Sequence, residues 1–262
     1  MPSKRKGKSR RRFVLIISTL LLLLFGGMMF YKWIAYRKAK LTRYKEFGIA
    51  IPDGFGIHGI DVSRYQHLIA WEEVKKMEVW NIKMGFAFIK ATEGIGNMDP
   101  QFRRNWQKCR ENDIIRGAYH FFIPTKDGKL QAENFIDKVK LRPGDLPPVL
   151  DVETKLSASP AALRREVKRW LDVVEEHYGV KPIIYTNADF YRQYLGVDFD
   201  QYPLWVAHYY EPRQPRIGRA WHFWQHNDSG QVNGITSKVD FNVFNGDSAS
   251  FRALLVPGAP EE

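Results

Sequence analysis

The stretch Pro147-Pro148-Val149-Leu150-Asp151-Val152-Glu153-Thr154 decides how the rest of the chain is interpreted. We predict that Pro148–Glu153 is a strand, in which alternate side chains share a face. Asp151 and Glu153 then lie on one face at the C-terminal end, with Cβ atoms roughly 6–7 Å apart. Because paired acids repel each other and lose solvation, this arrangement indicates acid/base chemistry better than packing.

The net charge of +11 comes from the N-terminal segment of the 262-residue chain. Residues 1–45 hold 13 Lys and Arg and no acid, which leaves 27 basic and 29 acidic residues for 46–262. The remainder is near neutral, so we expect no nucleic-acid partner. The single cysteine, Cys109, excludes an intrachain disulfide and a Cys-based metal site, and it is interpreted as a small buried residue.

The N-terminal segment reads as a membrane anchor. Residues 1–12 carry seven Lys and Arg, and the next 19 residues, Phe13–Tyr31, carry no charge. A helix of that length spans roughly 28 Å, enough to cross the apolar core of a bilayer. The run is longer than the apolar region of a signal peptide, and no small-residue cleavage motif follows it. We therefore favour an uncleaved transmembrane signal anchor at residues 13–31, in contact with membrane lipid. The alternative is a cleaved signal peptide.

The domain organisation follows from this anchor. The dense basic cluster of 1–12 predicts a cytoplasmic N-terminal tail and a single-pass topology. Residues 32–55 are expected to be a linker, and 56–262 a catalytic domain on the periplasmic or extracellular side.

Beyond residue 56, segments typical of strands alternate with segments of helical spacing. The predicted strands are 58–62, 85–91, 115–122, 148–153, 182–186, 204–208, 220–225 and 238–244. The predicted helices are 69–80, 99–112, 128–139, 160–178, 189–195 and a turn at 251–255. About five β/α units followed by three strands indicate an α/β fold, an irregular parallel (β/α) barrel preceded by one transmembrane helix.

Polar residues collect where the predicted strands end, which is where the active sites of such barrels lie. Asp61 ends the first strand, Glu93 follows the second, and Tyr119 is near the end of the third. The later strands add Tyr185, Gln225 and Asp240. Several acids that converge on one mouth are a stronger signal than the Asp-Val-Glu sequence alone.

Eight blocks, in order, resemble the lysozymes of glycoside hydrolase family 25, N-acetylmuramidases that cleave β-1,4 links in peptidoglycan. The resemblance covers about residues 57–246. The blocks are Gly59–Ser63 with Gln66, Ile89–Gly94, Gly117–Phe121, Pro148–Glu153, Ile184–Asn187, Leu204–Ala207, Trp224–Gln225 and Val239–Asn242.

The resemblance implies a role for each matching acid. Glu153 corresponds to the general acid, and Asp151 to the acid that positions the substrate's acetamido group. Asp61 and Asp240 correspond to two further acids of the cleft. The candidate substrate-binding residues are Tyr119, Glu93, Tyr185, Trp205 and Gln225, although Glu93 alternatively pairs with Lys90. The expected partner is the glycan strand of peptidoglycan, and no cofactor or metal ion is expected.

Two other functions stay open on the sequence alone. One is a catalytically silent peptidoglycan-binding protein on the same barrel, against which the presence of all four acids argues. The other is a hydrolase of another amino-sugar polymer such as chitin. Retaining, inverting and substrate-assisted mechanisms are all open, and the adjacent Asp151 and Glu153 favour the substrate-assisted one.

Overall fold

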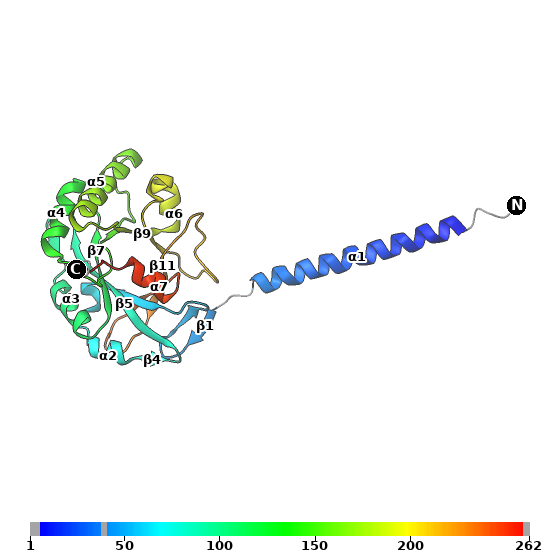
Figure 1. The fold of residues 1–262 in the computed structure, drawn as a ribbon, viewed down its shortest axis with the longest axis horizontal. Helices are drawn as coiled ribbons and strands as arrows, with labels where there is room; N and C mark the ends of the chain where they lie inside the picture. Colours follow the sequence, from blue (N-terminus) through cyan, green and yellow to red (C-terminus); the bar gives the residue numbers. More distant parts are fainter. Residues whose placement is uncertain (1–5, 38–40, 259–262) are drawn as a thin grey trace. The chain divides into compact units, whose positions relative to one another are not determined.

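The computed structural model describes residues 6–37 and 41–258, in two compact units divided between Lys40 and Leu41. The first unit holds helix α1 (Lys6–Arg37), drawn in blue in Figure 1. Its segment Phe13–Tyr31 is long and apolar enough to cross a membrane. Residues 1–5 of the predicted basic tail lie outside the described residues.

The second unit begins with a hairpin of β1 (Leu41–Tyr44) and β2 (Ile49–Pro52). Phe47 in its turn is fully buried and packs edge-on against Phe241, with ring centroids 5.3 Å apart. The prediction of a linker over 32–55 is therefore wrong over the hairpin, which belongs to the folded domain. The basic, Gly- and Pro-containing composition of this segment masks its alternating apolar residues.

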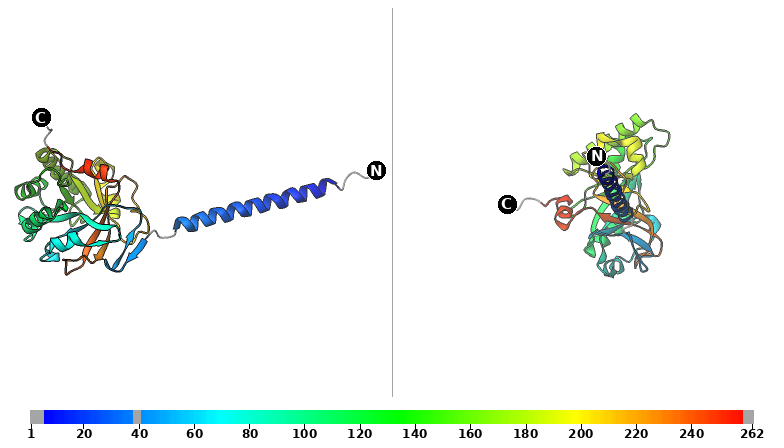
Figure 2. Two further views of the ribbon diagram at one scale, coloured as in Figure 1. Left: turned by 60° about the horizontal axis from the view of Figure 1, so that its bottom comes forward. Right: turned by 90° about the vertical axis from the view of Figure 1, so that its right-hand side faces the viewer.

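Within the described residues, eight strands close a barrel, which confirms the predicted fold class (Figures 1 and 2). Two short strands, β4 (Glu78–Val79) and β6 (Asn97–Met98), pair with β5 (Ile82–Glu93), the long second strand of the barrel. In order around the barrel, the eight strands are β3 (His58–Val62), β5 (Ile82–Glu93), β7 (Ile115–Phe121), β8 (Val149–Asp151), β9 (Ile183–Asn187), β10 (Leu204–Ala207), β11 (Phe223–Gly230) and β12 (Val239–Phe244).

The last strand runs against the others. β12 is antiparallel to both β11 and β3, whereas the remaining neighbours in the barrel are parallel. The prediction of a parallel barrel is therefore wrong for this strand, because a pattern of alternating residues does not encode strand direction. The reversal places the start of β12 where the parallel strands end, so Asp240, its second residue, reaches the mouth opposite Asp61.

Helices cover the outside of the first half of the barrel. They are α2 (Trp71–Lys76), α3 (Phe102–Glu111), α4 (Gly128–Lys138) and α5 (Pro160–Tyr178). After β9, the short α6 (Ala188–Phe190) continues as a π-helical turn (Tyr191–Leu195), and α7 (Ser248–Leu254) closes the chain. The helix predicted over 69–80 ends at Lys76, because Glu78 and Val79 leave it to pair with β5.

The longest of these helices shows how the sequence sets its ends. The Ser159 hydroxyl accepts a hydrogen bond from the Ala162 amide at 3.2 Å, and Pro160 occupies the first helical position. Gly179 ends α5 with a φ of +67°, a conformation that glycine adopts without steric cost.

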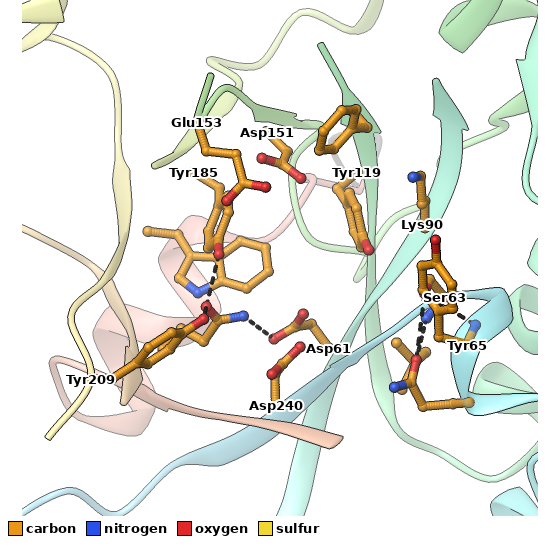
Figure 3. Close-up of a pocket in the computed structure, with 15 residues that line it drawn as sticks. Asp61, Ser63, Tyr65, Lys90, Tyr119, Asp151, Glu153, Tyr185, Tyr209 and Asp240 are labelled. Carbon is orange, nitrogen blue, oxygen red and sulfur yellow. Dashed lines mark hydrogen bonds between the residues drawn. The ribbon is translucent and has the colours of Figure 1, made fainter. Parts of the chain in front are cut away.

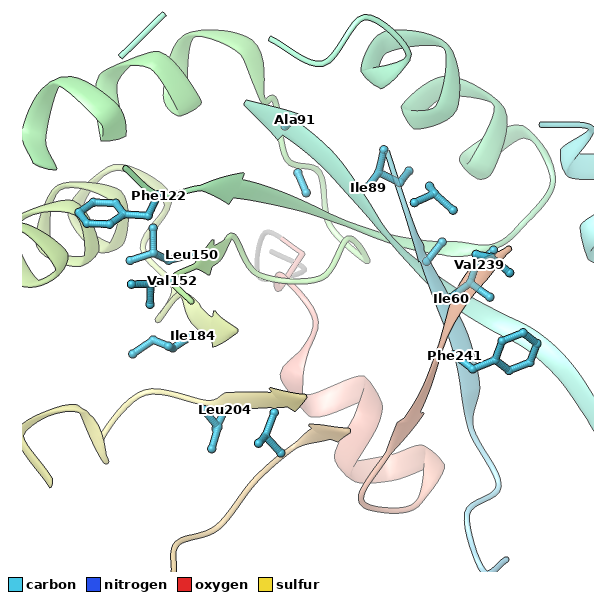
Figure 4. Close-up of a cluster of buried hydrophobic side chains, with 14 of the residues drawn as sticks. Ile60, Ile89, Ala91, Phe122, Leu150, Val152, Ile184, Leu204, Val239 and Phe241 are labelled. Carbon is cyan, nitrogen blue, oxygen red and sulfur yellow. The ribbon is translucent and has the colours of Figure 1, made fainter. Parts of the chain in front are cut away.

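Two apolar layers hold the barrel. The outer layer lies between strands and helices and includes Leu150 and Val152, as the alternation in the fourth strand predicts (Figure 4). The inner layer is aromatic, with Phe86 and Phe88 inside the barrel. Gly59 and Gly117 leave room for these rings, because a Cβ at either glycine would lie 2.6 Å from a ring carbon. The filled interior confines any ligand to the mouth.

Candidate active site

A cleft of about 280 Å³ lies at the C-terminal ends of the parallel strands. Figure 3 shows Asp61 and Asp240 together on one side of it, and Asp151 and Glu153 on another. The strand β8 ends at Asp151, and Glu153 follows two residues later with its side chain still directed into the cleft. The residues that line the cleft are Asp61, Val62, Ser63, Tyr65, Gln66, Lys90, Tyr119, Phe121, Asp151, Glu153, Tyr185, Trp205, Tyr209, Gln225 and Asp240.

Asp61 and Asp240 form a pair of adjacent carboxyl groups. They are directly opposite in the register of β3 and β12, and their side chains are hydrogen-bonded. Burial is the main cause that raises the pKa of both groups, and the charge of Asp61 raises the pKa of Asp240 further. Because the interaction between the two groups lowers the pKa of Asp61 and raises that of Asp240, Asp240 is the member that holds a proton to higher pH.

Two side-chain amides hold the Asp61 carboxylate. Its Oδ2 atom accepts hydrogen bonds from Gln225 Nε2 at 2.8 Å and from Asn242 Nδ2 at 2.7 Å. These donors favour the ionised form and partly offset the effect of burial on the Asp61 pKa.

The amides are oriented in turn by aromatic side chains. Tyr185 and Tyr209 donate from their hydroxyls to Gln225 Oε1 at 2.8 and 2.7 Å. With its oxygen occupied in this way, Gln225 turns its nitrogen toward Asp61. The indole nitrogen of Trp205 donates to Asn242 Oδ1 at 2.8 Å and has the same effect on that amide. A connected polar network of this kind fixes the geometry of the carboxylate at its centre.

Asp151 and Glu153 occupy the part of the cleft where buried carboxyl groups have the fewest hydrogen-bond donors among the described residues. Asp151 is 6% exposed, and its Oδ1 atom has no hydrogen-bond partner among the described residues. Burial, and then the charge of Glu153, raises its pKa well above the ordinary value. Burial, and then the charge of Asp61, raises the pKa of Glu153. A carboxyl that stays protonated above its ordinary range is suited to proton donation.

Lys90 is the cation that moderates these acids. Its charge lowers the pKa of both Asp151 and Glu153, against the dominant effect of burial. The ammonium group lies 2.7 Å from Glu93 Oε2 and 4.6 Å from the centre of the Phe121 ring. Glu93 therefore contacts Lys90 and does not line the cleft, which is the structural alternative that the sequence left open.

Tyr119 and Trp205 differ in what they offer a ligand. The Tyr119 hydroxyl points between the two groups of acids (Figure 3). Burial and the charge of Asp61 raise its pKa well above the ordinary value, so it is a neutral hydrogen-bond donor. Trp205 is 1% exposed and stacks on Phe88 with ring centroids 4.2 Å apart, so it forms the floor of the cleft.

All predicted site residues except Glu93 line the cleft, and seven further lining residues were not predicted: Val62, Ser63, Tyr65, Gln66, Lys90, Phe121 and Tyr209. Lys90 precedes Glu93 by three residues on β5 and is ion-paired with it. Tyr209 follows the end of β10 by two residues, just as Glu153 follows the end of β8. This shared offset is the signal that identifies Tyr209. In the described part of the chain, no three His, Cys, Asp or Glu side chains are grouped to hold a metal ion.

Comparison with known proteins gives the site its context. Residues 60–235 match the family described as glycosyl hydrolases family 25. The uncharacterized protein YegX of Escherichia coli strain K12 is 51% identical over 211 residues, which cover 80% of this chain and 78% of that protein. Lysozyme M1 of Streptomyces globisporus is 35% identical over 217 residues, covering 77% of this chain and 72% of that protein.

A solved structure agrees with the sequence relatives. The family 25 glycosyl hydrolase from Bacillus anthracis superposes with a TM-score of 0.71 and 33% identity. The match covers 81% of this chain and 98% of that one.

Proposed function

Since the chain belongs to glycosyl hydrolase family 25, we propose that it is a muramidase acting on peptidoglycan. The bond cleaved is the β-1,4 link between N-acetylmuramic acid and N-acetylglucosamine. One observation carries the proposal: four carboxyl groups, Asp61, Asp151, Glu153 and Asp240, line one cleft at the mouth of the barrel. The lysozymes among the relatives support peptidoglycan as the substrate.

The proposed first step uses both members of the Asp-Val-Glu sequence. Glu153 transfers its proton to the glycosidic oxygen as the bond from that oxygen to the anomeric carbon breaks. The carbonyl oxygen of the sugar's own acetamido group forms the new bond to the anomeric carbon, giving a cyclic oxazolinium ion. Asp151 Oδ1, which has no hydrogen-bond partner among the described residues, accepts a hydrogen bond from the acetamido N–H and stabilises the positive charge that develops on this group.

In the second step, the Glu153 carboxylate takes a proton from water, and the water oxygen attacks the anomeric carbon. The oxazolinium ring opens, the acetamido group is restored, and Glu153 regains its proton. Asp61 and Tyr119 contact the sugar from the other side of the cleft, with Asp61 held by Gln225 and Asn242. Covalent trapping of a sugar ester on Asp151 or Asp61 would exclude this mechanism.

We further propose that Phe13–Tyr31 anchors the enzyme in the membrane, with the N-terminus in the cytoplasm. The length and apolar character of α1 support a span, and the basic cluster of 1–12 supports this orientation. The catalytic domain then faces the periplasm or the outside, where peptidoglycan lies. A tethered enzyme of this kind is suited to local remodelling of the wall.

The test is the Glu153→Gln variant of the full chain, assayed on purified peptidoglycan. The wild type is expected to clear a turbid suspension and to release new reducing ends on muramic acid. Loss of general-acid catalysis lowers the rate about 10²–10⁴-fold. An inactive wild type that still binds peptidoglycan would favour the silent binding protein. New reducing ends from chitin, and none from peptidoglycan, would favour the other polymer.

A further inference from the structure

Trp80 has no role in the barrel fold or in the cleft, yet its conformation is unusual. It occupies the tight turn between β4 and β5 with a φ of +57°, and it is 83% exposed. A bulky residue with positive φ is strained, and Asn or Gly is the ordinary choice in such a turn. Strain and high exposure together indicate that the indole serves something outside the domain.

The position of Trp80 within the domain is defined by its neighbours. A hollow of about 740 Å³ separates the turn from the β1–β2 hairpin, with Trp80 and Asn81 on one wall and Thr42–Glu46 and Pro52–Gly56 on the other. His58, at the start of β3, also lines it. The hollow therefore belongs to the N-terminal end of the barrel strands, the end opposite to the catalytic cleft.

The connection to the proposed anchor, through a basic segment of the chain, singles out this end of the barrel for a lipid surface. Only residues 38–40 separate α1 from β1, so the hairpin is the part of the domain tethered nearest to the proposed anchor. The segment 32–45 carries six Lys and Arg and no acid. Four of these six precede the domain in the chain, and within the domain the exposed charges around the turn and the hairpin balance: Arg43, Lys45 and Lys83 against Glu46, Asp53 and Glu78. The opposite end carries the acids of the cleft.

We propose that Trp80, together with the β1–β2 hairpin, docks on the anionic phospholipid headgroups of the membrane that holds α1. The inference rests on the proposed anchor. Trp partitions to the membrane interface, and basic residues beside it are attracted to anionic lipid. Docking at this end turns the cleft away from the bilayer and toward the peptidoglycan strands.

The experiment uses the full chain in vesicles of phosphatidylcholine and phosphatidylglycerol whose acyl chains are brominated near the headgroup. A fluorophore is attached at Asn81→Cys or, as a matched control on the mouth side, at Ile95→Cys, which is 51% exposed. Cys109 is fully buried and does not compete for the label. Quenching at position 81 is expected to exceed that at position 95 by roughly two-fold or more, and equal quenching at both positions overturns the proposal.

A second variant tests the contribution of the Trp80 indole apart from that of the hairpin. Trp80→Asn in the Asn81→Cys background places a residue that tolerates positive φ in the turn, so the thermal midpoint should not fall. Quenching at position 81 is expected to drop toward the value at position 95. Unchanged quenching in this variant would show that Trp80 does not dock on lipid.

Two controls keep the anchor and the docking distinct. Flotation of the full chain with vesicles after a high-salt wash tests the anchor, so a chain that floats without quenching at position 81 refutes only the docking. Pull-down by purified peptidoglycan tests the other class of partner. Loss of that pull-down in Trp80→Asn would assign the indole to glycan and overturn the proposal.

Discussion

The two ends of the barrel treat buried charge in opposite ways. At the N-terminal end, Arg116 on β7 is paired with Asp145 through Nε–Oδ1 and Nη2–Oδ2 contacts of 2.8 and 3.2 Å. The guanidinium also lies 3.9 Å above the centre of the Trp106 ring. At the mouth, the described lining residues include four acids and one cation, Lys90, and Asp151 Oδ1 has no hydrogen-bond partner among the described residues. Equal burial therefore stabilises one end and strains the other, because only one end supplies matching partners.

The largest effect on stability is expected from removing one partner of the Arg116–Asp145 pair at the N-terminal end of the barrel. Arg116→Met leaves the buried Asp145 carboxylate without its counter-charge, and such a loss costs about 3–5 kcal/mol in the free energy of unfolding. Urea unfolding followed by circular dichroism measures it. The rate on peptidoglycan per folded molecule should not change, because Arg116 is remote from the cleft.

The double variant Arg116→Met with Asp145→Asn is the matched control for this pair. It removes the unpaired charge as well, so much of the lost stability should return. A double variant as unstable as Arg116→Met alone would mean that packing against Trp106, and not charge pairing, holds this end of the barrel.

An intermediate effect, a gain in stability where Arg116→Met causes a loss, is expected at the mouth. Asp151→Asn removes a carboxyl whose pKa burial and Glu153 raise in the folded state. Above the ordinary value of 3.8, the unfolded chain releases this proton while the folded chain retains it. The wild type therefore loses stability as pH rises through the window between the unfolded and folded pKa values.

The variant should accordingly gain about 1–2 kcal/mol at pH 7 and little at pH 4, while losing muramidase activity. Unfolding curves at the two pH values measure the gain. Asp53→Asn, at an exposed residue of the hairpin, is the control and should shift neither curve appreciably. A loss of stability at pH 7 would mean that the unpartnered carboxylate is a structural group, and the contrast between the ends would fail.

The difference between local patterns and long-range contacts explains how much of the fold and of the cleft the sequence alone predicts. The order of strands, the amphipathic α5 and the acids at strand ends are local patterns, and they predict the barrel and most of the cleft. The direction of β12 is set by pairing with β3, which is distant in the sequence. The hairpin at 41–52 likewise depends on a distant contact, with Phe241, that no local pattern contains. The Lys90–Glu93 pair is local, and the sequence offers it as one of two alternatives.

The smallest effect is expected from substitution of Lys90, the cation beside Asp151 and Glu153 at the mouth. Lys90 lowers the pKa of Glu153 and Asp151, so Lys90→Met should raise both. Glu153 then keeps its proton to higher pH, and the alkaline limb of the rate profile on peptidoglycan should move upward. Lys90→Arg retains the charge and should leave the limb in place. A limb that moves downward in Lys90→Met would mean that the cation acts on the acids through geometry, because removing its charge alone can only favour their protonated forms.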